Sequence, residues 1–117
     1  MKVVILVMLA ALAASSTQTT PSVLTLRDAI EIVADYEILH PQVPYQTNWY
    51  GMTEPDMKQI FIIKNADLAI RRRTAIHELI HVARHNRGYV VTGSPEEEAY
   101  AVQQADVLYR ALFGGEQ

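Results

Sequence analysis

The segment from Leu68 to Arg87 constrains the fold most, because it passes through twenty residues without a proline or a glycine. Apolar residues at helical spacing within it predict one long helix, and Gly88 is a residue type that commonly follows a helix end. On the helical wheel, His77 and His81 lie together beside an arc of five apolar residues: Ala69, Ile76, Leu79, Ile80 and Ala83. One arc is therefore expected to face the core, and its neighbour is expected to form a site.

The residues His77-Glu78-Leu79-Ile80-His81 form an H-E-x-x-H motif on this helix. Residues four apart lie about 40° apart and one turn along the axis, so both imidazoles can reach one ion at about 2.0 to 2.1 Å. Glu78 lies about 100° from His77, beside the ion, where a carboxylate can take a proton from activated water. We predict that His77 and His81 bind a metal and that Glu78 is a general base. The alternative is two surface histidines near a salt-bridging glutamate.

A third metal ligand is needed, because a catalytic zinc normally has three protein ligands and one open position. His85 lies another turn along the same helix and is expected either at the surface or in contact with a ligand residue. His40 precedes a proline in a loop, and nothing in the sequence positions it. The acidic triplet Glu96 to Glu98 is the better source, because it opens the next helix after a short loop.

The helix that carries the triplet is expected from Ser94 to Phe113, with Ser94 as the N-cap and Glu97 as its capping-box partner. The centre of its apolar face falls at the azimuth of Glu98, whereas Glu96 points away from it. A carboxylate on an apolar face is costly unless it is paired or bound to a metal, so we expect Glu98 to be the third ligand. The alternative is a solvated acidic helix start.

The remainder of the chain predicts a helix and a hairpin. Thr25 can cap a helix from Leu26 to Glu37. Two strands, Tyr45 to Gly51 and Met57 to Ile63, are separated by the turn signal Thr53 to Asp56. The fold class is therefore α+β, and 117 residues allow a single domain, placed at residues 21–117.

With these residues the chain resembles the zincin metallopeptidases, in particular small gluzincin-like members in which H-E-x-x-H is followed by a glutamate on the next helix. The resemblance extends from about Tyr45 to Phe113. It implies a minimal zincin-like domain with one zinc ion on the two histidines and a downstream glutamate. It also implies peptide-bond hydrolysis with Glu78 as the base. The chain departs from the Asn-Glu-x-x-Ser-Asp pattern of larger relatives. If Glu98 is the glutamate of that pattern, Ala101 and Val102 occupy the positions of its serine and aspartate. A non-catalytic metal-binding or protein-binding module on the same scaffold is the alternative.

The first residues resemble a secretory signal, because Met1-Lys2 is followed by an uncharged, mostly aliphatic run and then by a polar stretch. Cleavage after Ala13 would remove residues 1–13, and the alternative is a buried helix or an uncleaved anchor. A twelve-residue helix spans about 18 Å, short of the roughly 30 Å bilayer core. We therefore expect export, either secreted or periplasmic, and no stable membrane span after cleavage.

The composition narrows the chemistry and the partners. The chain has no cysteine, which excludes disulfides, thiolate zinc sites and cysteine nucleophiles. A net charge of -3, with one basic run at Arg71 to Arg73, argues against a nucleic-acid partner. The expected partner is a peptide or protein substrate, and nothing in the sequence indicates an oligomeric state.

Several other side chains have two interpretations each. Arg73 and Arg84 project near the azimuth of the histidines, and either hold a substrate carboxylate or extend into water. Tyr89 and Tyr100 either stabilise an oxyanion or pack as ordinary aromatic residues. Three further aromatic residues either line a cleft or cover the core: Tyr45, Trp49 and Tyr50.

Overall fold

The computed structural model describes residues 23–42, 50–89 and 94–114. Their elements, in chain order, are α2 (Leu26–Asp35), β1 (Glu37–Leu39), β2 (Gly51–Glu54), a 3-10 turn (Pro55–Met57), β3 (Gln59–Ile62), α3 (Leu68–Asn86) and α4 (Pro95–Phe113). The expected α+β class is confirmed.

We expected a signal segment at the N-terminus and no stable membrane span after its cleavage. The proposed signal segment at residues 1–13 lies outside the described ranges. Among the helices that are described, none combines the length and the apolar character needed to cross a membrane.

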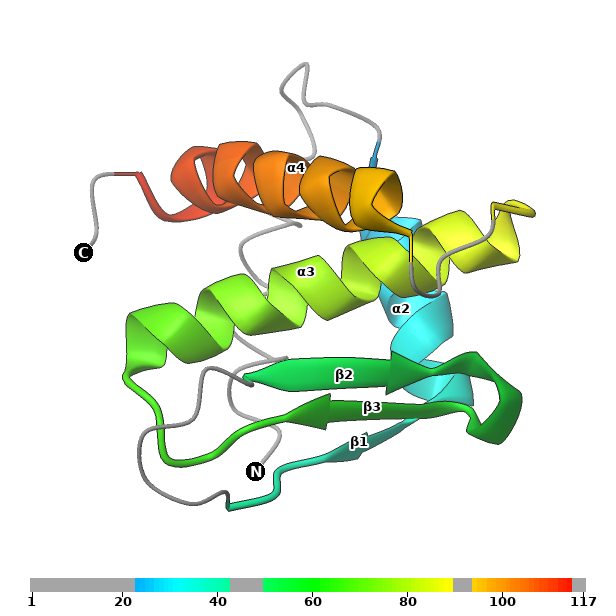
Figure 1. The fold of residues 1–117 in the computed structure, drawn as a ribbon, viewed down its shortest axis with the longest axis horizontal. Helices are drawn as coiled ribbons and strands as arrows, with labels where there is room; N and C mark the ends of the chain where they lie inside the picture. The colour runs from blue at the N-terminus through cyan, green and yellow to red at the C-terminus, as the bar shows by residue number, and fades with distance from the viewer. Residues whose placement is uncertain (1–22, 43–49, 90–93, 115–117) are drawn as a thin grey trace.

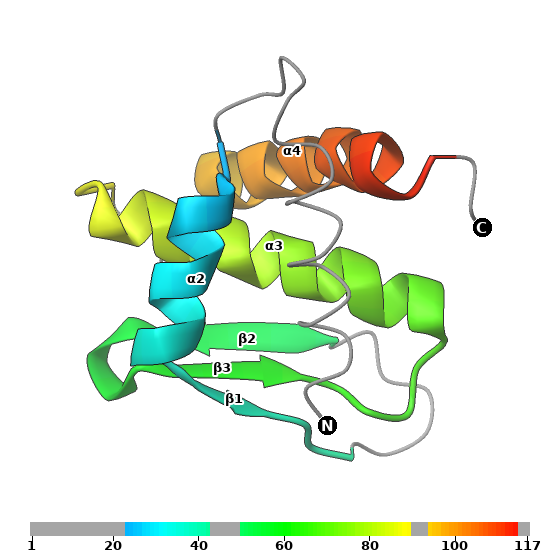
Figure 2. The same cartoon turned by 180° about the vertical axis from the view of Figure 1, so that it is seen from behind.

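The helix α3 lies between the three-stranded sheet and α4 (Figure 1). Figure 2 shows α2 crossing α3 from the level of α4 down to the sheet. Side chains from all of these layers meet in one core, because α3 is buried on both its sheet side and its α4 side. The core includes Ile32 of α2, Ile60 and Ile62 of β3, Ile76, Leu79 and Ile80 of α3, and Ala105, Leu108 and Tyr109 of α4.

The sheet has the order β1-β3-β2, so β2 is an edge strand of the described sheet. The predicted hairpin is present, because β2 pairs antiparallel with β3 and Gly51 lies opposite Ile62. Its first strand extends further than predicted, because β2 runs from Gly51 to Glu54 and so includes the start of the predicted turn; residues 45–49 lie outside the described ranges. The turn begins at Pro55, which has no N–H to donate to a partner strand.

A second difference is the strand β1, which the sequence did not predict. The helix α2 ends at Asp35, and Tyr36 turns to an extended conformation with a buried ring. Three residues from Glu37 then pair in parallel with β3. A strand this short shows too little alternation to be recognised, and the predicted helix therefore ran two residues too far.

The other helix ends agree with the sequence. Thr25 and Asp28 form a capping box at the start of α2. Gly88 follows α3 with a φ of 94°, a conformation that glycine adopts readily. Ser94 caps α4 by accepting a hydrogen bond from the backbone N–H of Glu97. These caps fix where α3 ends and α4 begins, and so which residues of the two antiparallel helices face each other.

Candidate metal centre

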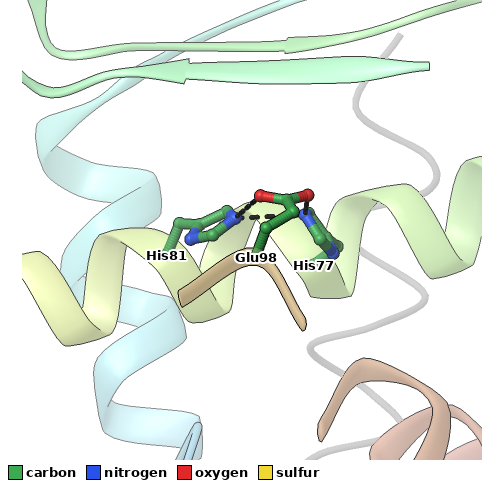
Figure 3. A group of neighbouring side chains, drawn as sticks. All are labelled: His77, His81 and Glu98. Atoms are coloured by element: carbon green, nitrogen blue, oxygen red, sulfur yellow. Dashed lines mark hydrogen bonds and ion pairs between the residues drawn. The ribbon is translucent and has the colours of Figure 1, made fainter. Parts of the chain in front are cut away.

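Three side chains from α3 and α4 meet at one point beside the sheet. His77 and His81 lie one turn apart on α3, and Glu98 comes from the first turn of α4 (Figure 3). The Nε2 atoms of the two histidines are 3.1 Å apart. The Glu98 carboxylate spans both rings, with one oxygen 2.8 Å from the Nε2 of His77 and the other 3.1 Å from the Nε2 of His81.

This spacing fits a tetrahedral ion. Two donor atoms that are each about 2.0 to 2.1 Å from a zinc ion lie about 3.3 Å apart at the tetrahedral angle. The distance of 3.1 Å between the two Nε2 atoms is close to that value, and one donor atom from each of the three residues lies within 4.8 Å of the others. Within the described residues, this is the group of histidine, aspartate and glutamate side chains whose geometry can hold a metal.

The protonation state of His77 also favours the binding of a metal. Burial lowers the pKa of its imidazole, although the negative charge of Glu98 acts in the opposite direction. A neutral imidazole keeps a lone pair for a metal, whereas an imidazolium has none. The ring is therefore held in the form that a ligand requires near neutral pH.

The other ring nitrogen of His81 faces a second carboxylate. Its Nδ1 is buried and makes no hydrogen bond within the part of the chain that the structure describes. An oxygen of Glu97 lies 3.6 Å away from it, slightly beyond hydrogen-bond distance. Histidines that bind a metal commonly donate their second N–H to a carboxylate, which fixes the ring and its tautomer. Glu97 stands where such a partner is needed.

Glu97 is itself held by Arg84. The Nε of Arg84 donates to both carboxylate oxygens at 3.0 and 2.8 Å, and Glu97 is 7% exposed. The guanidinium lies between the rings of Tyr89 and Tyr100, at 4.0 and 4.1 Å from their centroids. A charge pair covered in this way is only weakly screened by water.

These contacts correct two predictions. Glu97 does not complete a capping box, because its carboxylate bonds to Arg84 on the neighbouring helix and not to the backbone of Ser94. Arg84 does not extend into water, since it is bonded to Glu97 and stacked. Tyr89 and Tyr100 pack on the guanidinium, which agrees with the interpretation that they are packed aromatic residues.

The strand β2 positions Glu78 next to the three-residue cluster. The hydroxyl of Thr53 donates to one oxygen of Glu78 at 2.6 Å. Gly51 allows this close approach, because a Cβ there would collide with the Cγ2 of Thr74 and lie 3.2 Å from the other oxygen of Glu78. One carboxylate oxygen is therefore bound by the strand, and the residue still contributes to the wall of a cleft.

Glu78 is 5% exposed, and this burial raises the pKa of its carboxyl to about 7. The hydrogen bond from Thr53 lowers the pKa, and the charge of Glu98 raises it further. A carboxyl with a pKa near neutrality can both accept and release a proton at physiological pH. The residue predicted as a general base therefore has an environment suited to that role.

The cluster opens onto a cleft of about 650 Å³ between β2 and α4, with α3 as its floor. Eleven residues line it: Tyr50, Gly51, Arg73, Thr74, His77, Glu78, Glu98, Val102, Gln103, Ala105 and Asp106. Tyr50 is thus a cleft residue, as one interpretation had it, while Tyr45 and Trp49 lie outside the described residues.

The structure brings Glu98 to the two histidines, but not for the reason that the wheel suggested. The Glu98 side chain is 59% exposed, whereas the inward-facing acid of the triplet is Glu97. Val102, one turn after Glu98 on the same side of α4, is 55% exposed. The buried face of α4 is therefore centred about 50° from the azimuth of Glu98, toward that of Glu97. That Glu98 binds a metal remains a prediction.

The other histidines lie apart from this cluster. His85 is exposed on the last turn of α3, as expected. The Nδ1 of His40 lies 3.1 Å from the carbonyl oxygen of Ile62 at the sheet. Neither belongs to the group of side chains that can hold a metal.

Sequence reasoning missed Thr53 and the pair of Arg84 with Glu97. Thr53 carried no local signal, because its partner is 25 residues away and is reached only through the sheet. The pair of Arg84 and Glu97 had a weak signal, namely an arginine three residues after His81 and an acid one residue before Glu98.

Comparisons with protein-family models, with curated proteins and with solved structures found no match to this chain. Any assignment of function therefore rests on the residues and on their geometry.

Proposed function

We propose that this protein is a zinc-dependent metallopeptidase. The observation that carries the proposal is the placement of Glu78, a buried carboxylate with a pKa near 7, beside the cluster of His77, His81 and Glu98 in a cleft wall. A structural metal site has no need of such a carboxylate, and burying it without a function costs stability.

The two histidines and Glu98 would hold the ion. When bound there, zinc supplies a Lewis acid that polarises a carbonyl and makes water a stronger acid. Glu78 would accept the proton of the attacking water and pass it to the leaving amine nitrogen. The hydroxyl of Thr53 would fix one carboxylate oxygen and leave the other for this transfer.

The edge strand β2 supports a peptide as the substrate. It borders the cleft through Gly51, and its outer edge is not paired within the described sheet. An extended peptide can add to such an edge by backbone hydrogen bonds, which would lay its carbonyl groups along the cleft. Export of the enzyme remains part of the proposal, resting on the sequence of residues 1–13.

Zinc content and peptide hydrolysis test the proposal together. Purified protein should contain about one zinc ion per chain, and it should cleave members of a broad peptide library. Glu78→Gln should keep the zinc and lose hydrolysis. Glu96→Gln is the matched control, because this exposed acid on α4 contacts the hydroxyl of Ser94 and not the cluster. It should keep both properties.

The outcomes separate the enzyme from its alternative. Protein without zinc after mild purification would contradict the metal site. Zinc-loaded protein that cleaves no peptide would favour a non-catalytic binding module on this scaffold.

A further inference from the structure

The cleft continues past the side chains of His77 and Glu98 to a charged end formed by Arg73 and Asp106. Arg73 lies one turn before His77 on α3, so the two side chains belong to one row along the cleft floor. Asp106 lies two turns after Glu98 on α4, which runs antiparallel to α3. A group bound at this end would sit next to a peptide bond held at the cluster.

The guanidinium of Arg73 is held in place but remains accessible. Its Nη1 donates to Asp106 at 2.9 Å, and its central carbon lies 4.5 Å from the centroid of the Tyr109 ring. The side chain is nevertheless 46% exposed. A guanidinium has five N–H donors, and the bond to Asp106 uses one of its nitrogens. It can therefore keep Asp106 and also bind a ligand.

The charge at this end favours an anion. Asp106 also forms an ion pair with Arg110, whose Nε lies 3.3 Å from the second carboxylate oxygen of Asp106. Two guanidinium groups thus share one carboxylate, which leaves one positive charge uncompensated in this group. The neighbouring lining residues Val102, Gln103 and Ala105 carry no charge.

We infer that Arg73 binds a carboxylate of the peptide, and that this contact selects which peptides occupy the cleft. The inference rests on the proposed function to the extent that the ligand is a peptide. Guanidinium groups bind carboxylates with paired, charge-assisted hydrogen bonds, which suits an arginine already oriented by an aromatic ring and an aspartate. The carboxylate would be either the C-terminal group or the side chain of an aspartate or glutamate.

A binding experiment distinguishes these sources without requiring turnover. Zinc-loaded Glu78→Gln protein would be titrated into four pools of fluorescently labelled pentapeptides with the same varied positions. One pool has a free C-terminal carboxylate, and one is amidated. Two further amidated pools carry a fixed glutamate or a fixed lysine. We expect the free-acid pool, the glutamate pool or both to bind at least about tenfold more tightly than the plain amidated pool.

Variants then assign the preference to one residue. Adding Arg73→Gln should reduce the difference between the carboxylate and amide pools to less than about twofold. Arg110→Gln is the matched control, because it removes an equal charge beside Asp106 from a residue that does not line the cleft. It should keep most of the preference, which separates a direct contact from a general field effect.

Three results would overturn the inference: equal affinity for all four pools, tightest binding of the lysine pool, or an unchanged preference after Arg73→Gln. The first two use protein with Arg73 intact, so they do not depend on how a variant folds. Hydrolysis of the same pools by wild-type protein tests the proposed function separately. Cleavage without a carboxylate preference would refute only the role of Arg73. A carboxylate preference without cleavage would refute only the peptidase.

Discussion

Replacing Glu78 with glutamine should change how the stability of the metal-free protein depends on pH. Burial raises the pKa of this carboxyl from an ordinary value of 4.5 to about 7. An acid whose pKa is raised by folding binds its proton more tightly in the native state. Its favourable contribution is therefore complete below pH 4.5 and is lost as the pH rises through 7. A shift of this size corresponds to about 3 kcal/mol, since one pKa unit is worth about 1.4 kcal/mol.

The assay is urea unfolding of wild-type and Glu78→Gln protein in the presence of a chelator, between pH 4 and pH 8. Other titrating groups are common to both proteins, so the difference between their unfolding free energies isolates Glu78. This difference should move by about 3 kcal/mol in favour of the variant as the pH rises. Glutamine keeps the size of the side chain and can still accept the hydrogen bond from Thr53.

Glu96→Gln is a suitable control for this experiment. Glu96 is exposed, and hydrogen bonds from its own backbone and from Ser94 lower the pKa of its carboxyl. Any pH dependence that it contributes has the opposite sign to that of Glu78. Parallel pH profiles for wild-type and Glu78→Gln protein would refute the reasoning, because they would mean that Glu78 is solvated in the folded protein.

Three further predictions concern the residues around the cluster. Thr53→Val should lower kcat about tenfold or more with zinc content unchanged, and Thr53→Ser should restore it, because only serine keeps the hydroxyl that donates to Glu78; equal kcat values for the two variants would contradict this. Gly51→Ala should destabilise the protein by about 1 to 3 kcal/mol in urea unfolding, since a Cβ there would lie 2.8 Å from a backbone oxygen. In metal titrations, Glu98→Ala should weaken zinc binding most, and Glu97→Ala should weaken it about 10- to 100-fold by freeing the ring of His81. Unchanged affinity in Glu97→Ala would mean that Glu97 does not orient that ring.

The parts of the fold that the sequence could predict are those determined by local spacing. The run from Leu68 to Arg87 shows its helical period over several turns, and Gly88 lies directly after it. The motif His77 to His81 is also local, because two residues four apart on a helix must lie on the same face. The hairpin was predicted in kind, since the pairing of β2 with β3 follows from a short connection at Pro55.

The contacts that position Glu78, the proposed general base, could not be predicted in this way. Thr53 reaches Glu78 only because the sheet packs beneath α3, and Gly51 matters only because of what a Cβ would meet there. Both residues belong to β2, whose start depends on its pairing with β3. An error of one residue in the predicted register would turn both side-chain positions to the opposite face of the sheet. A pairing between elements, unlike a helical face, leaves no periodic pattern in either element alone.

The acidic triplet shows why a helical wheel assigns such a site incompletely. Adjacent helical residues differ by about 100° in azimuth, so Glu97 and Glu98 approach His81 from different sides, one toward Nδ1 and one at Nε2. In the proposed site, the ligand Glu98 is exposed beside the buried face, where a bound ion can meet a substrate. An acid that is buried on that face must instead be paired with a cation, as Glu97 is with Arg84. The inward-facing acid after an H-E-x-x-H helix therefore predicts the partner of the ligand, and its exposed neighbour is the better candidate for the ligand itself.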